Sequence, residues 1–170
     1  MIKQFVPSEA CLKCQGCCRF REMDSAWTPC LLEEEIQDLI DKDIPAAYIN
    51  IQKKIRPVPD PKGEGFLCAF LDADSNKCKI YQMRPFECQL YPFLINLRNN
   101  KVVLTVDLNC PYVQENMNKK EFKEYADYLA AYLNSPEQLE ILTDNPQIIQ
   151  AYEDVRDVIE LKFPGPDAPK

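Results

Sequence analysis

The amino-acid sequence predicts an α+β protein with a small, cysteine-rich, metal-centred core. Three observations predict this class: cysteines cluster near the start of the chain, short strand-like runs alternate with turns in its middle, and helical periodicity dominates after residue 118. A chain of 170 residues can bury a sizeable core. We therefore expect short antiparallel strands, flanking helices and a C-terminal helical segment.

The same observations predict three parts of the chain. We expect a cysteine-cluster metal-binding domain over residues 1–117 and a helical extension packed on it over 118–163. Residues 164–170 are rich in proline and lack a hydrophobic pattern, so we expect a disordered tail there.

The first part of the chain carries the strongest chemical signal, the run Cys11-Leu-Lys-Cys14-Gln-Gly-Cys17-Cys18. Thiolates separated by two residues can surround one metal ion or cluster, because the backbone curls around it. Gly16 lets this turn close without a side-chain clash. Because Cys17 and Cys18 are adjacent, we expect them to point in different directions and to serve two different sites.

The sequence places the protein in the cytoplasm. Its N-terminus has no apolar run of signal-peptide length, and no segment approaches the roughly 20 apolar residues that cross a bilayer. Thiols stay reduced in that compartment, so the nine cysteines indicate metal ligation and not disulfides.

The formal charge of −7 is unevenly distributed. Residues 11–21 and 77–98 each carry a net +3, which leaves −13 for the rest of the chain. Cations near the cysteines stabilise thiolates. The acidic remainder argues against nucleic-acid binding, and the lack of a polybasic tract argues against a membrane-surface role. The expected partner is a metal ion or cluster, and no protein partner is indicated.

The first half of the chain predicts two helices and a pair of strands. Thr28 is the expected N-cap of a helix that runs to residue 40, with Cys30 in its first turn. A short helix is expected from Pro45, followed by a Pro/Gly-rich loop over 55–65. Strands are then predicted over residues 66–71 and 77–81, paired across the turn between them.

The second half begins with a helical turn. Pro85 is expected to open this turn, which carries Cys88, and Pro92 to end it. A hairpin is predicted from residues 94–97 and 102–106, joined by two asparagines.

Three helices are predicted beyond the hairpin. The first is expected to be capped by Asn118, the second to start at Pro136, and the third to follow Pro146. The predicted buried faces of the first and third helices are Phe122, Tyr125, Ala126, Leu129 and Leu133, and Ile148, Ile149, Tyr152, Val155 and Ile159.

The cysteine count matches thiolate sites. With Cys30 set aside as a bystander, eight cysteines match two four-thiolate sites, or one such site with reserve ligands. The absence of histidine excludes His-containing zinc sites, His-ligated haem and facial-triad iron. Three cysteines at intervals of three residues favour an iron–sulfur cluster slightly over Zn²⁺, and both metals stay possible. The candidate ligands are Cys11, Cys14, Cys17, Cys18, Cys68, Cys78, Cys88 and Cys110.

Two further residues are expected around the metal. The planar guanidinium of Arg84 is suited to donate hydrogen bonds to metal-bound sulfur. The alternative is a surface salt bridge from Arg84 to Glu87. Tyr81 is expected to shield the site, with ordinary packing as its alternative.

These motifs resemble the YkgJ-type cysteine-cluster family, whose domains are described as zinc- or iron-chelating. The likeness spans about residues 8–112 and includes two cysteine motifs in order. The matching residues are Cys11-x-x-Cys14-x-x-Cys17-Cys18, Phe66-Leu-Cys68, Cys78-x-Ile80-Tyr81-x-x-Arg84-Pro85-x-x-Cys88 and Tyr91-Pro92-Phe93. The resemblance implies metal chelation without a reaction, and Cys30 lies outside the pattern.

Three functional hypotheses follow. The first is a metal-binding protein of undetermined cellular role. The second is an iron–sulfur enzyme, either a redox protein or a methyltransferase, because flagellin lysine methylases carry a similar cysteine cluster. The third is a protein-interaction module with a structural metal, whose acidic helices would meet a basic partner. A pocket that contains Arg84 would favour the second hypothesis.

Overall fold

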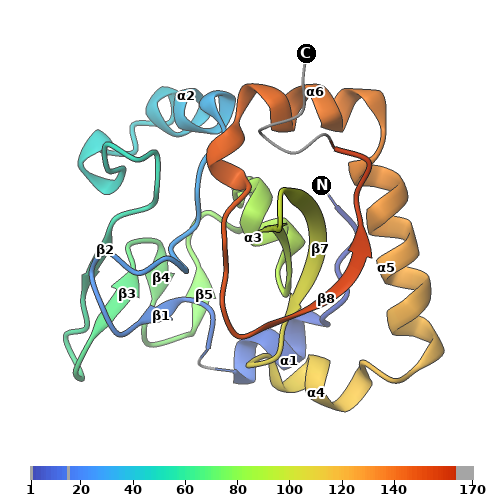
Figure 1. Ribbon diagram of the computed structural model, residues 1–170. Helices are drawn as coiled ribbons and strands as arrows, with labels where there is room; N and C mark the ends of the chain where they lie inside the picture. The colour runs from blue at the N-terminus through green and yellow to red at the C-terminus, as the bar shows by residue number, and fades with distance from the viewer. Residues whose placement is uncertain (1, 15, 164–170) are drawn as a thin grey trace. The chain divides into compact units, whose positions relative to one another are not determined.

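The structure, a computed structural model, describes residues 2–14 and 16–163 (Figure 1). The described chain forms two compact units. The first comprises Ile2 and Val6–Gln89, and the second comprises Lys3–Phe5 and residues 90–163. Both units combine helices with antiparallel strands, which confirms the α+β class. The predicted tail over 164–170 lies outside the described residues.

The first unit is built from short elements around two small sheets. Strands β1, β3 and β2 form one antiparallel sheet in that order, and β4 pairs with β5 in the other (Figure 1). Leu31, Leu39, Ile55 and Phe70 are among the buried side chains of its core. The elements are α1 (Ser8–Lys13), β1 (Arg19–Phe20), α2 (Glu33–Asp41), the 3-10 helix η1 (Ala46–Tyr48), β2 (Pro57–Pro59), β3 (Phe66–Cys68), β4 (Leu71–Asp72), β5 (Lys77–Cys78), the 3-10 helix η2 (Tyr81–Met83) and α3 (Phe86–Leu90).

Helix α2 begins later than predicted. The Thr28 hydroxyl donates to the Ser25 carbonyl at 2.8 Å instead of capping a helix. Helix α2 instead starts after Leu32, whose backbone N–H donates to the Glu35 carboxylate at 2.9 Å. The prediction that Cys30 lies in the first helical turn is therefore wrong. Cys30 forms a β-bridge with Lys54.

The predicted strand over 66–71 is divided into β3 and β4, which belong to different sheets. Part of the predicted loop forms β2, an edge strand with a proline at each end. Proline is tolerated in an edge strand, because one side of such a strand has no neighbour that needs a backbone N–H donor. Two predictions in this unit are confirmed: η1 after Pro45 and the helical turn that carries Cys88. The strand predicted over 77–81 is present only as Lys77–Cys78, and Tyr81 belongs to the 3-10 helix η2.

The second unit is a three-stranded antiparallel sheet with helices (Figure 1). The predicted hairpin is confirmed. Asn99 and Asn100 have φ of 48° and 61°, as a two-residue type I′ turn requires. The elements are β6 (Phe93–Arg98), β7 (Lys101–Asp107), α4 (Pro111–Asn116), α5 (Lys120–Leu133), α6 (Pro136–Asp144), the 3-10 helix η3 (Pro146–Ile148) and β8 (Val155–Glu160).

Helices α5 and α6 confirm two predictions, with one shift. Helix α5 buries the predicted face, but its N-cap is Lys119 and not Asn118. Ser135 caps α6 through a hydrogen bond from the Gln138 N–H at 3.4 Å. Helix α4, directly after Cys110, was not predicted.

The predicted final helix is wrong, because residues 155–160 form strand β8. Its backbone pairs with the free edge of β7, and Ile159 lies opposite Leu104. Valine and isoleucine favour strands when a neighbouring strand is available, so pairing outweighs the helical spacing of these residues. Strand β8 completes the sheet and lies beside α5 (Figure 1).

Candidate metal centre

The first unit contains seven of the eight predicted ligand cysteines. Four of them lie in the N-terminal motif, and the others come from β3, β5 and α3. Cys110, at the N-cap of α4, belongs to the second unit. No disulfide joins any of the nine cysteines, all of which lie within the described residues. The seven in the first unit are Cys11, Cys14, Cys17, Cys18, Cys68, Cys78 and Cys88.

Backbone pairing places two of these thiol-bearing segments side by side. The Cys68 N–H donates to the Cys18 carbonyl at 2.9 Å, directly after the antiparallel pair of Arg19 and Leu67. In the second sheet, Cys78 lies opposite Leu71. The short strands therefore bring cysteines that are 50 or more residues apart in the chain into one neighbourhood.

Cys18 is the common electrostatic neighbour of these thiols. A side-chain hydrogen bond with Cys17 lowers the pKa of Cys18, and the positive charges of Arg19 and Arg84 lower it further. The same hydrogen bond raises the pKa of Cys17. That Cys17 and Cys18 point in different directions and serve two different sites stays a prediction.

Three further thiols of the group, those of Cys68, Cys78 and Cys88, favour the neutral form in the absence of a metal. Burial raises the pKa of Cys68 to about 12, and the negative charge of a Cys18 thiolate adds to the effect. Burial likewise raises the pKa of Cys78 and that of Cys88, again with a contribution from Cys18. A cation among these sulfur atoms would reverse this preference, because metal coordination deprotonates thiols.

The thiols are close enough to influence one another's ionisation, but they are not drawn together as a finished coordination shell. Within residues 2–14 and 16–163, no group of three or more cysteine, aspartate or glutamate side chains is arranged to hold a metal ion as it stands. The ligand set therefore stays a prediction. The soft, all-sulfur donor set fits zinc or iron.

Arg84 places unpaired donors beside the thiol group. Its Nε and Nη2 are buried and have no hydrogen-bond partner in the described parts of the chain. Its guanidinium carbon lies 4.3 Å from the centre of the Tyr81 ring. Buried donors are almost always satisfied, so these two indicate an acceptor that joins the site, such as metal-bound sulfur.

Glu87 does not lie at the surface, where the alternative for Arg84 placed it. Its side chain is buried, and its Oε2 accepts a hydrogen bond from the Cys30 N–H at 2.5 Å. Helix α3 is also held by Glu35 of α2, whose Oε1 accepts from the Phe86 N–H at 2.5 Å. Two buried carboxylates thus join the helix that carries Cys88 to α2 and the residues before it.

Cys30 lies with these carboxylates. Burial raises the pKa of Cys30 to about 12, and the charge of Glu87 raises it further. The charges that shift the pKa of the Cys30 thiol are those of Glu87 and Lys54. The pKa values of Cys68 and Cys88 are instead shifted by other cysteines, Cys18 among them. This surrounding supports the prediction that Cys30 is not a ligand.

Asn76 was missed by sequence analysis, although it organises the N-terminal motif. Its Nδ2 lies within hydrogen-bond distance of the Cys14 carbonyl (2.6 Å), the Leu12 carbonyl (2.9 Å) and the Cys11 carbonyl (3.4 Å). Its Oδ1 accepts from Arg19 Nη1 at 2.8 Å. The sequence indicated only a turn at this position.

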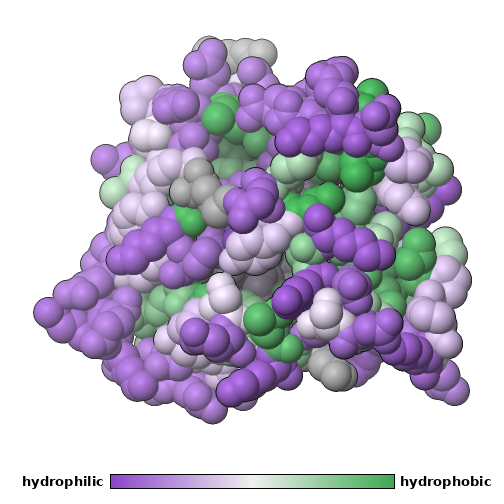
Figure 2. Space-filling model, turned by 180° about the vertical axis from the view of Figure 1, so that it is seen from behind, coloured by the Kyte–Doolittle hydropathy of each residue, from purple (hydrophilic) through white to green (hydrophobic). Residues whose placement is uncertain are grey.

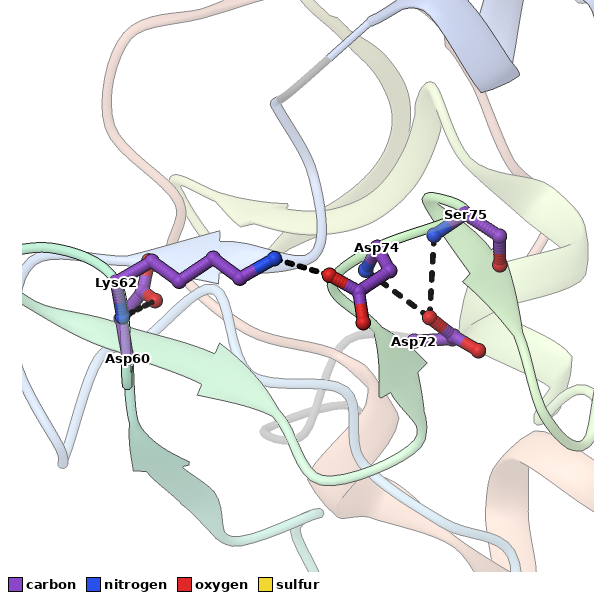
Figure 3. Close-up of polar contacts among 5 residues, drawn as sticks. All are labelled: Asp60, Lys62, Asp72, Asp74 and Ser75. Atoms are coloured by element: carbon purple, nitrogen blue, oxygen red, sulfur yellow. Dashed lines mark hydrogen bonds and ion pairs between the residues drawn. The ribbon is translucent and has the colours of Figure 1, made fainter.

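Asn76 ends the β4–β5 turn, whose polar contacts are shown in Figure 3. The Asp72 carboxylate accepts from the backbone N–H groups of Asp74 and Ser75 at 3.0 and 3.1 Å. Lys62 forms an ion pair with Asp74 in the same turn. Asn76 has φ of 57°, a conformation that asparagine tolerates better than most residues. The turn therefore ties the segment that carries Cys11 and Cys14 to the strand that carries Cys78.

A polar pocket of about 400 Å³ lies between α2 and the η2–α3 segment. It combines acidic side chains from α2 with the cations Lys42 and Arg84. Its lining residues include Glu34, Glu35, Asp38, Gln82, Met83 and Gln89.

The face of the molecule seen in Figure 2 is mostly polar. Hydrophilic residues cover most of the face seen in Figure 2, and hydrophobic residues show between them. No helix within the described ranges has both the length and the apolar character needed to cross a membrane.

Comparisons with known proteins agree with the cysteine pattern. Residues 10–157 match the family described as "CxxCxxCC: Putative zinc- or iron-chelating domain". The chain is 29% identical over 138 residues to "Uncharacterized protein MJ0661" of Methanocaldococcus jannaschii, across 75% of this chain and 71% of that protein. No solved structure matches. The family match supports metal binding as the class of function.

Proposed function

We propose that the protein, which belongs to the CxxCxxCC family, binds zinc or iron through cysteine thiolates of its first unit. The observation that carries this proposal is the pairing of β1 with β3. The Cys68 N–H donates to the Cys18 carbonyl at 2.9 Å, which brings cysteines 50 residues apart in the chain side by side. Cysteines clustered at metal-ligand spacing suit a reducing compartment, so we also propose the cytoplasm.

The proposed ligands are drawn from the seven thiols of the first unit. Four thiolates complete a zinc site or one iron–sulfur cluster, so the seven provide one full site and reserve ligands. When bound, zinc would supply structural cross-linking and an iron–sulfur cluster would supply one-electron chemistry. Cys110, in the second unit, stays a predicted ligand that mutagenesis has to test.

Arg84 is proposed to support the bound metal. Its two buried, unpaired nitrogens would donate hydrogen bonds to thiolate sulfur and disperse its negative charge. Tyr81, whose ring lies against the guanidinium, would hold Arg84 in this orientation and shield the site.

The decisive test is anaerobic purification followed by metal analysis, sulfide analysis and a visible spectrum on one sample. Brown protein with iron and acid-labile sulfide identifies a cluster, and colourless protein with one or two zinc ions per chain identifies a zinc site. Protein that retains neither metal, and takes up neither under reducing conditions, contradicts the proposed function.

An iron–sulfur enzyme is the second candidate. The observation that favours it is the 400 Å³ pocket, because Arg84 lines the pocket and also acts electrostatically on Cys18 and Cys78. A substrate in the pocket could therefore contact the side chain that acts on these two thiols. Reversible bleaching of the cluster by dithionite would support this candidate, and a zinc-only protein would reject it.

A further inference from the structure

The polar pocket of about 400 Å³ lies entirely within the first unit, between α2 and the η2–α3 segment. A pocket of this volume is large enough to hold a small organic molecule. Among the described residues, none of the cysteines lines it. The charges and apolar groups of its lining therefore indicate a ligand of their own, separate from the metal.

One wall of the pocket carries charges of both signs at helical spacing. Glu34 and Asp38 of α2 and its C-cap residue Lys42 follow one another at intervals of four residues, and all three are exposed. Side chains four residues apart on a helix have Cβ atoms about 5–6 Å apart. This wall therefore offers a carboxylate and an ammonium group one helical turn from each other.

The ammonium group of Lys42 is held by a weak acceptor. Its Nζ lies 3.1 Å from Met83 Sδ, and thioether sulfur accepts hydrogen bonds only weakly. Within the described ranges no ion pair joins Lys42 to Asp38, although a spacing of four residues would permit one. A carboxylate that enters the pocket would offer Lys42 a stronger acceptor than the sulfur atom.

Arg84 supplies the second cation of the pocket, from the η2–α3 side. Its buried Nε and Nη2 are the donors proposed for metal-bound sulfur. Its Nη1 carries two further N–H donors. Because the guanidinium is planar and has donors along several edges, it can bind a carboxylate in the pocket and sulfur at the same time.

The Glu35 carboxylate also lines the pocket, but the backbone engages it. Its Oε2 accepts from the Leu32 N–H at 2.9 Å and its Oε1 from the Phe86 N–H at 2.5 Å. The lining then retains two acids, Glu34 and Asp38, and two cations. Such a balance of charge is complementary to a ligand that carries both signs and no net charge.

The pocket also has an apolar surface. The buried Leu39 and the half-buried Met83 both belong to its lining. An aliphatic group that covers these side chains gains free energy by leaving water.

We propose that this pocket binds a small zwitterion, an α-amino acid with an aliphatic side chain. The ligand's carboxylate binds Lys42 and Arg84. Its ammonium group binds Asp38 and Glu34, and its side chain covers the apolar surface. The charged groups of an α-amino acid share one carbon atom, which suits an acid and a base one helical turn apart. This inference names a ligand class for the pocket of the second candidate function, and it requires no bound metal.

Isothermal titration calorimetry of the full-length protein tests this inference. The probes are L-valine, L-leucine and L-methionine, each with its deaminated and its decarboxylated analogue. At least one of the three amino acids should bind at millimolar concentration. Each of its analogues should bind at least about tenfold more weakly, because each lacks one charge-assisted contact.

Two substitutions on α2 and at its C-cap test the two ends of the ligand. Asp38→Asn and Lys42→Gln should each weaken binding of the amino acid by about fivefold, the upper range for one exposed charge pair. Both residues are exposed, so the variants should fold and hold metal as the wild type does. The matched controls are Asp127→Asn and Lys123→Gln, the same changes four residues apart on the exposed face of α5, and these should bind like the wild type.

Metal content is measured on the same samples, which separates this inference from the proposed function. Metal-loaded protein that binds none of the three amino acids overturns the inference alone. Analogues that bind as tightly as the amino acid overturn it as well, and so do Asp38→Asn and Lys42→Gln variants with wild-type affinity. Protein that binds an amino acid but neither zinc nor iron rejects the proposed function and supports the inference.

Discussion

The Glu35 carboxylate and the Phe86 backbone N–H, 51 residues apart in the chain, form a 2.5 Å hydrogen bond. Through this bond, α2 caps the start of α3, the helix that carries the proposed ligand Cys88. A second carboxylate, Glu87, links α3 back to Cys30. The geometry of the proposed metal site therefore depends on groups that bind no metal.

Glu35→Ala should destabilise the protein by about 1–3 kcal/mol at pH 6, because two backbone N–H groups lose their acceptor. Urea unfolding of the full chain measures this change. The neighbouring exposed residue provides the control, and Glu34→Ala should stay within about 0.5 kcal/mol of the wild type. An equal effect of both substitutions would contradict a structural role for Glu35.

Glu35 should also make stability depend on pH. Burial raises the pKa of Glu35 from 4.5 to about 7, so the folded protein holds a proton that the unfolded chain has lost in this window. Stability should therefore fall as the pH rises from about 4.5 to 7, by an amount on the order of 3 kcal/mol. Glu35→Gln should remove this part of the pH dependence. Unfolding free energies at pH 5, 6, 7 and 8 test this, and parallel curves for the two proteins would refute it.

Cys14→Ala and Cys88→Ala should each release metal and lower stability by several kcal/mol, since metal binding contributes directly to folding. Metal analysis after dialysis and chemical unfolding of the same samples measure both effects. Unchanged metal content in either variant would remove that cysteine from the ligand set. Metal analysis of Cys110→Ala decides in the same way whether Cys110 is a ligand.

Cys30→Ala should leave the metal content unchanged. Because Cys30 is 1% exposed, the substitution leaves a small cavity, and we expect a loss of about 1 kcal/mol in stability. Metal analysis and unfolding again provide the readouts. A drop in metal stoichiometry would show that Cys30 belongs to the site.

Arg84→Lys should keep the metal stoichiometry and weaken metal affinity by about tenfold, because lysine lacks the planar fork that serves two acceptors. Competition with a chelator of known affinity measures the change. Arg98→Lys is the control, since Arg98 pairs with Asp157 on the exposed surface of the other unit. If the wild type and Arg84→Lys bind the metal with equal affinity, the proposed hydrogen bonds from Arg84 to metal-bound sulfur are contradicted.

The sequence by itself determined the features that depend on neighbouring residues. Cysteine spacing identified the family and the metal chemistry. The Asn99–Asn100 turn predicted the hairpin, and Ser135-Pro136 predicted the start of α6. In each case the information lies within a few residues, because turn, cap and ligand-loop geometries are local.

Only the tertiary structure decided the rest. Residues 155–160 have helical spacing, but the free edge of β7 pairs with them as a strand. Asn76 holds the backbone of Cys14, 62 residues earlier, and the buried Glu87 accepts a hydrogen bond from the Cys30 N–H, 57 residues earlier. These contacts satisfy buried polar groups with partners that are distant in the chain, and no local pattern encodes such a choice.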